Sequence, residues 1–239
     1  TLSWRLMINS AYFFLGFKSV RSFDSPAIAL ACSFIAIGAL VKNIGFNLKQ
    51  SFFSTFFTYA LPGQLVMAES FFIGASLINI FIGVWLVNAR LFPMAVSMFP
   101  LLKSNKQPKW KYYLSCHFLA VSSWLIMKKD YRTITEEFRI DFWIGIGTAT
   151  WSIAIISTVF GFFVSDYLSK DMMIGLAIVN PIYFFCMLIG SIKNIAIGTS
   201  VILGTILGPA FYLISPEWCI LYGGLSAGII AFFLGEFDG

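Results

Sequence analysis

The chain has 239 residues, of which 59% are hydrophobic and only 11% are charged, whereas soluble domains carry about 25% charged residues. So few charges cannot cover the water-facing surface of a globular protein of this size, which excludes a disordered chain, a coiled coil and an ordinary cytosolic enzyme. The formal net charge of +5 does not indicate nucleic acid, because Lys and Arg lie mostly in short gaps between apolar runs, as membrane topology signals do. The composition therefore predicts a polytopic protein of the lipid bilayer.

The N-terminal segment, residues 1–26, is predicted to lie along the membrane interface. Its apolar run Leu6–Phe17 is flanked by Arg5 and Lys18 and is shorter than the ~17–25 residues that a crossing needs. The sequence Asp24-Ser25-Pro26 is typical of a helix start, with a capping side chain and a proline in the first turn. A single transmembrane domain is expected over residues 27–239.

The remaining chain predicts an all-α bundle of about seven or eight transmembrane helices, since open strands leave backbone groups unpaired in lipid. The stretch Leu91–Leu102 is apolar but only about half a span long, so it either extends the third helix past Arg90 or forms a half-helix. The expected spans are Ala27–Ile44, Ser51–Ala68, Ser70–Leu86, Trp110–Met127, Phe142–Ser165, Met172–Ile192, Ile195–Ile214 and Trp218–Leu234.

Two loops are clearly polar. The segment Lys103–Lys111 holds four lysines and no acid, and the segment Lys128–Asp141 mixes both signs of charge. The positive-inside rule favours the cytoplasm for the first loop. Eight crossings, however, place the two loops on opposite faces with nearly equal basic counts, so the sequence leaves the orientation open.

Prolines suggest an internal repeat with possible halves at residues 27–127 and 142–235. Pro62 and Pro93 in the first half are matched by Pro181 and Pro209 in the second, at similar separations. Proline inside a span frees backbone carbonyls, and paired breaks of this kind point to a transporter site near the midplane. The alternative is four independent kinks, since proline is common in membrane helices.

The candidate binding site centres on the first break. In Pro62-Gly63-Gln64, Gly63 lets the chain turn and Gln64 supplies two donors and an acceptor, while a half-helix that starts there points its N–H groups at the gap. Asn88 and Arg90 follow the third span, and the Arg90 guanidinium fits a carboxylate. The alternatives are a simple kink with Gln64 bonded to a neighbouring helix, and an arginine that reaches the interface.

Other polar residues have weaker signals. Asn180 is expected to bond carbonyls freed by Pro181, His117 to pack between helices, and Glu69 to be a loop residue rather than a proton carrier. The four cysteines are scattered in apolar runs, which predicts buried thiols. The sequence indicates no metal site, no cofactor and no enzyme, because it has no paired carboxylates, phosphate loop or nucleophile motif.

The stretch Ala60–Leu102 resembles the signature region of the AzlC family of branched-chain amino acid permeases. That family has a small-residue turn ending in Gln, which falls here on Gly63-Gln64, and an L-V-N-x-R-H-type motif, which falls on residues 86–91 with Leu91 in place of His. The order of spans fits over most of the chain. The chain departs from the family at two places, since Val121–Trp124 stands where an Asp-Glu pair is usual and Ala177 where an acid precedes the proline.

The resemblance implies a multi-pass protein of the bacterial inner membrane that exports branched-chain or other apolar amino acids with a small AzlD-like membrane subunit. The candidate substrate-binding residues are Gly63, Gln64, Asn88, Arg90 and Asn180; of these, Gln64, Asn88 and Arg90 are expected to hold the carboxylate end, with aromatic residues nearby enclosing the side chain. Loss of the family acids implies a different substrate or a different coupling. The alternative is a membrane-embedded subunit that transports nothing itself; a lipid-modifying enzyme would need converging polar side chains that the sequence does not offer.

Overall fold

The computed structural model describes residues 8–21, 26–190, 192, 195–214 and 219–236. The chain divides into two compact units, residues 1–181 and 182–239, with the boundary inside helix α10. The predicted all-helical class is confirmed, since every element of secondary structure in the described residues is a helix. Asp24 and Ser25 of the expected helix start lie outside these residues, and helix α2 begins directly after Pro26.

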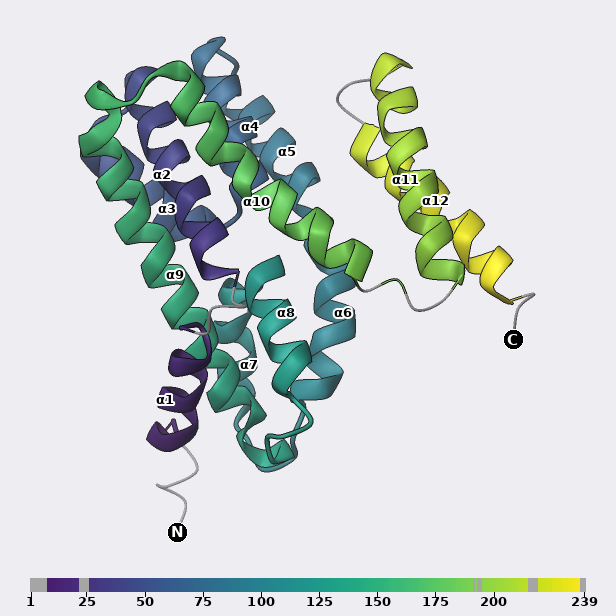
Figure 1. Cartoon of the computed structure of the whole chain (residues 1–239). Helices are drawn as coiled ribbons and strands as arrows, with labels where there is room; N and C mark the ends of the chain where they lie inside the picture. Colours follow the sequence, from purple (N-terminus) through teal and green to yellow (C-terminus); the bar gives the residue numbers. More distant parts are fainter. Residues whose placement is uncertain (1–7, 22–25, 191, 193–194, 215–218, 237–239) are drawn as a thin grey trace. The chain divides into compact units, whose positions relative to one another are not determined.

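The helices of the first unit are short and frequently interrupted (Figure 1). Several of them have about half the length needed to cross a bilayer. In chain order the α-helices are α1 (Ser10–Ser19), α2 (Ala27–Asn43), α3 (Leu48–Thr58), α4 (Leu61–Phe72), α5 (Leu77–Asn88), α6 (Leu91–Leu102), α7 (Lys109–Ser115), α8 (Val121–Asp130), α9 (Arg139–Val164) and α10 (Lys170–Gly190).

Helices α3 and α4 form a hairpin of two half-length helices. The chain leaves α2, turns at Gly45 (φ 96°) and enters α3, and it breaks at Tyr59 and Ala60 before α4 begins. The ring of Phe46, just before α3, packs edge-on against Phe71, at the end of α4, with 4.8 Å between ring centroids. The hairpin therefore opens at the end of the unit where α2 ends, and the expected span Ser51–Ala68 is not one straight crossing.

A second hairpin consists of α7, the 3-10 turn η2 (Cys116–Phe118) and α8. Its two flanking loops lie together, because Lys106 Nζ contacts Glu137 Oε2 at 2.9 Å and Gln107 Nε2 donates to the Glu137 carbonyl at 2.7 Å. The sequence interpretation placed these loops on opposite faces and was wrong. The error arose because an apolar run that enters and returns has the same length and hydropathy as one that crosses.

Helix α9 is the element against which α1 and α2 pack (Figure 1). Glycines allow this close approach, since a Cβ at Gly145 would overlap the carbonyl of Phe13 on α1, and one at Gly161 would overlap that of Ile35 on α2. Small residues at helix contacts are the usual means by which membrane helices approach each other. α1 therefore contributes to the packed unit through its contact with α9.

Length and composition identify two described helical segments that can cross a membrane, Glu136–Tyr167 and Ile197–Ile214. A third arises if α5 and α6, which meet at an angle of 49°, count as one bent span. The stretch Leu91–Leu102 is thus a separate half-helix that continues α5 beyond a bend at Arg90, which combines the two alternatives expected for it. The count of seven or eight crossings is not confirmed.

Helix α10 is continuous through Pro181, and α11 (Ile195–Ile214) is continuous through Pro209. The prediction that these prolines interrupt spans is wrong at the level of the backbone. Proline removes the N–H that would pair with the carbonyl four residues earlier, here that of Ala177. Ser33 Oγ on α2 donates to this carbonyl at 3.4 Å, so a neighbouring helix supplies the missing donor and the helix persists.

A fully buried ion pair lies beside the base of the second hairpin. Lys111 Nζ on α7 contacts Asp141 Oδ1 on α9 at 2.7 Å, and both side chains are at most 1% exposed. Gln107 Oε1 also accepts from Lys111 Nζ at 2.8 Å. The sequence interpretation read both charges as parts of polar loops; the structure instead uses them to join α7 to α9.

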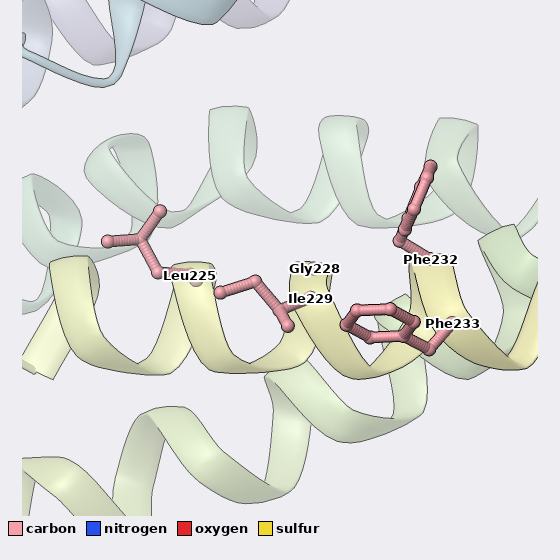
Figure 2. Close-up of a pocket in the computed structure, with 6 residues that line it drawn as sticks. Leu225, Gly228, Ile229, Phe232 and Phe233 are labelled. Carbon is pink, nitrogen blue, oxygen red and sulfur yellow. The ribbon is translucent and has the colours of Figure 1, made fainter.

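The second unit contains α11 and α12 (Cys219–Glu236), which pack against each other through glycines. A Cβ at Gly223 would lie 3.1 Å from the Gly208 Cα atom. A shallow depression on this unit is lined by apolar residues and glycines of α12 (Figure 2). These residues are Gly224, Leu225, Gly228, Ile229, Phe232 and Phe233, so the depression offers no side chain that would bind a polar group.

Candidate solute site where two hairpins meet

The tips of the two hairpins meet within the first unit. The ring of Tyr59, at the break between α3 and α4, lies 6.3 Å from the ring of His117 in η2. Leu61 and Ala120, which flank the starts of α4 and α8, pack against the same buried cluster around Ala154 of α9. Because the hairpins open at opposite ends of the unit, their tips bring two helix starts and two helix ends together in its interior.

Gln64 is fully buried in the first turn of α4 and is held by a relay of hydroxyl groups. Its Nε2 atom lies 2.9 Å from Thr55 Oγ1, which lies 2.9 Å from Thr158 Oγ1 on α9. Thr158 Oγ1 in turn donates to the Ala154 carbonyl at 2.9 Å. The relay confirms the interpretation that Gln64 bonds to a neighbouring helix, but its Oε1 atom is buried without a hydrogen-bond partner.

Gly63 and Asn88, predicted separately from the sequence, are brought into direct contact. A Cβ atom at Gly63 would lie only 2.7 Å from Asn88 Nδ2 and 2.9 Å from Asn88 Oδ1. Gly63 does not make the turn, since its φ is not positive and the break occurs earlier, at Tyr59 and Ala60. Its role is to give the Asn88 side chain room, and the buried Asn88 Oδ1 atom also has no hydrogen-bond partner.

A second group of buried polar atoms lies at the tips themselves. The Tyr59 hydroxyl faces Thr150 on α9 and Ser122 at the start of α8. The oxygens of Tyr59 and Ser122 are buried without a hydrogen bond of ordinary geometry. A buried polar group that lacks a partner costs roughly 1–3 kcal/mol, and such groups are often found where a protein binds something. In the described residues such atoms occur on Tyr59 and Ser122 at the tips, on Gln64 of α4, on Asn88 of α5 and on Ser51 of α3.

The other two predicted site residues are placed differently. Arg90 is exposed at the bend between α5 and α6, two residues beyond Asn88. The backbone of Asn180 belongs to α10, but its side chain lies outside the part of the chain that the structure describes, so its predicted role stays a prediction. The expectation that paired proline breaks mark the site loses its basis at Pro181, because α10 is unbroken there.

Three weaker expectations are corrected by the structure. Glu69 is an exposed residue of α4 rather than a loop residue. His117 packs against Tyr59 and Trp151, as a helix-packing histidine would, but it does so from an exposed position in the 3-10 turn at a hairpin tip and not from within a span. The cysteines were expected to be buried, yet Cys116 and Cys186 are exposed and Cys32 is half-buried. Each error follows from treating an apolar run as a continuous, buried helix.

Comparison with protein families gives a match to AzlC, described as AzlC protein, over residues 25–168. This range exceeds half of the chain. The chain belongs to the AzlC family. The family is generally associated with membrane transport of branched-chain amino acids, so this AzlC protein is a membrane protein of a transporter family. No curated protein and no solved structure matches the chain.

The AzlC match covers both hairpins and α9. Every buried polar atom without a partner described above lies within the matched range. Sequence reasoning found Gly63, Gln64 and Asn88 but missed Thr55 and Thr158, which orient Gln64. Thr158 lies among apolar neighbours in α9. A lone polar residue in a long apolar stretch was therefore the sequence signal that could have identified it.

Proposed function

We propose that this AzlC protein exports branched-chain or other apolar amino acids across the bacterial inner membrane. The supporting observation is the set of buried polar atoms without a hydrogen-bond partner at the hairpin tips and on α4 and α5, in a chain whose exposed surface is rich in large apolar side chains. Interrupted helices that meet in the interior are the usual construction of solute sites in secondary transporters. Polar groups at membrane depth are costly and are generally retained for function.

In this proposal Gly63, Gln64 and Asn88 form the polar wall of the solute site, and Arg90 attracts the carboxylate. Gly63 lets Asn88 approach α4 at the turn that also carries Gln64. Arg90, two residues beyond Asn88 and exposed, carries the positive charge nearest to this wall along the chain. Its planar guanidinium suits a carboxylate. Asn180 is retained as a candidate on sequence grounds alone.

The charge distribution of the first unit supports an orientation. The two loops that lie together, Lys103–Lys111 and Lys128–Asp141, carry eight Lys and Arg residues. The opposite end carries three, which are Lys42, Lys49 and Lys170; Lys42 marks this end through its 2.6 Å ion pair with Asp166, just beyond α9. By the positive-inside rule, the end with eight basic residues faces the cytoplasm.

A small AzlD-like membrane subunit completes the proposal. Flux of radiolabelled leucine, isoleucine, valine and methionine into proteoliposomes tests it, with this chain alone and with an AzlD-type partner. Gln64→Ala is expected to lower leucine flux at least tenfold, and Gln50→Ala, at an exposed position of α3, should leave it unchanged. Equal flux of every amino acid in wild type and Gln64→Ala would overturn the site. No flux with or without the partner would favour the alternative, a non-transporting subunit.

A further inference from the structure

Gln64, Thr55, Thr158 and the Ala154 carbonyl form a chain of three hydrogen bonds. The carbonyl at its end fixes which group donates in each of them. A carbonyl oxygen can only accept, so Thr158 must give its single hydroxyl proton to the Ala154 carbonyl. Thr158 therefore accepts at its contact with Thr55, and Thr55 must give its own proton to Thr158. Thr55 then has no proton left for Gln64 and can only accept from the Gln64 amide NH₂.

This order determines which end of Gln64 is presented to the solute. With Nε2 committed to Thr55, the atom left without a partner is the carbonyl oxygen Oε1, which is buried and accepts hydrogen bonds only. Turning the amide round would place two acceptors, Oε1 and Thr55 Oγ1, against each other. The sequence interpretation placed Gln64 at the carboxylate of the solute, and the direction of the relay opposes that pairing.

We infer that Gln64 Oε1 binds the ammonium group of a zwitterionic solute, an assignment that rests on the proposed transport function. The hairpin tips supply helix ends of both signs, and the positive end of α4, where Gln64 lies, is one of them. α3 ends beside Tyr59 with the negative end of its helix dipole, and α8 begins at Val121 with the positive end of its own. An ammonium and a carboxylate therefore each find a helix end of opposite sign within the group formed by the two tips.

In the part of the chain that the structure describes, no hydrogen bond brings a carboxylate to Gln64. Among the described residues, Glu69 is exposed, and Asp141 and Asp166 lie in ion pairs close to the two ends of α9. A neutral acceptor together with helix dipoles favours an ammonium group on a solute that also has a carboxylate, because the solute then has no net charge. It would select less well for a simple amine, whose charge would remain uncompensated.

The test compares leucine with two analogues that each lack one charged group. These are 3-methylbutylamine, which lacks the carboxylate, and 4-methylpentanoate, which lacks the ammonium. Binding to the purified full chain is measured by calorimetry for wild type, Gln64→Leu and Gln64→Glu. Gln64→Leu is expected to weaken leucine and the amine tenfold or more and to leave 4-methylpentanoate unchanged. Gln64→Glu is expected to bind the amine at least tenfold more tightly, because a charged acceptor replaces a neutral one.

The matched control is Gln50→Glu, the same chemical change at an exposed position where the side-chain oxygen accepts from the Asn47 N–H. It should alter none of the three affinities. Thr158→Val removes the hydroxyl that orders the relay, so the preference for leucine over 4-methylpentanoate should fall. If Gln64→Glu does not fold, the affinities of Gln64→Leu and Thr158→Val for the three ligands decide whether the inference holds.

Different failures of this experiment have different meanings. If Gln64→Leu weakens 4-methylpentanoate and leaves the amine unchanged, Gln64 serves the carboxylate and the inference is overturned, while the transport proposal stands. An equal loss for all three ligands also overturns the inference, because Gln64 would then only shape the site. If wild type binds neither leucine nor either analogue, the proposed function fails and the assignment fails with it.

Discussion

Replacing Lys111 with methionine tests whether the second hairpin packs against α9 as the structure shows. The substitution keeps most of the side-chain volume and removes the ammonium that faces Asp141 at 2.7 Å. Asp141 is only 1% exposed, so its carboxylate is left buried without its cationic partner. An ionised group in that position retains its desolvation cost after the attraction that offset it has gone.

The magnitude follows from this burial. Removing one partner of a buried ion pair typically destabilises a protein by about 3–5 kcal/mol, whereas replacing both partners with apolar residues of similar volume is often neutral or stabilising. The double variant Lys111→Met/Asp141→Leu is therefore expected to be more stable than either single variant. The nearby pair Lys106–Glu137 is the matched control, because its contact distance is 2.9 Å but its side chains are 61% and 36% exposed. Exposed pairs contribute about 0–1 kcal/mol, so Lys106→Met should cost less than about 1 kcal/mol.

The assay is denaturant-induced unfolding in detergent micelles followed by tryptophan fluorescence. Trp143 is a suitable reporter, because it is fully buried and its Nε1 atom donates to the Ser115 carbonyl at the end of α7 at 3.2 Å. A hairpin that detaches from α9 must break this bond. Equal unfolding free energies for Lys111→Met and Lys106→Met would refute the reasoning, as would a double variant less stable than both single ones.

Two further predictions concern the site and the topology. Gly63→Ala should lower the unfolding free energy by about 1–3 kcal/mol because its Cβ would overlap Asn88, and Asn88→Ala in the same chain should restore it; Gly175→Ala, where the structure leaves open space, should be neutral or slightly stabilising. Single cysteines at Lys106 and Arg132, introduced into a chain without its native cysteines, should react with a membrane-impermeant maleimide from the same side of the membrane. Labelling from opposite sides would mean that the second hairpin crosses after all.

The sequence was sufficient to predict the helical class and a membrane protein, and it singled out Gly63, Gln64 and Asn88, whose role in binding stays a prediction. Those predictions rest on composition and on polar residues in apolar surroundings, which depend on local chemistry alone. Gly63 and Asn88 are distant in the chain, and their contact could not be predicted because it depends on how α4 packs against α5.

Both hairpins were read as spans, for a physical reason. A half-helix that returns buries the same apolar residues as one that continues, so hydropathy does not separate the two. The break before α8 contains neither proline nor glycine; Ser123 Oγ accepts there from the Ala120 N–H and donates to the Phe118 carbonyl. Pro62, by contrast, lies in the first turn of α4, where proline is compatible with a helix. Proline therefore marked a helix start at residue 62 and no break at residue 181.

The threonines of α9 explain why the direction of hydrogen bonding at the site is fixed by the fold. A threonine in an apolar helix commonly gives its proton to the carbonyl four residues earlier, and Thr158 does so to Ala154 as Thr150 does to Ile146. Each hydroxyl then offers only an acceptor to its neighbours on other helices. Thr158 thereby forces Thr55 to donate, and Thr150 can pair with the Tyr59 hydroxyl only if Tyr59 donates. Because α9 presents acceptors at both levels, Thr55 and Tyr59 must direct their hydroxyl protons at α9, and Gln64, which donates to Thr55, is left with Oε1 as an acceptor without a partner.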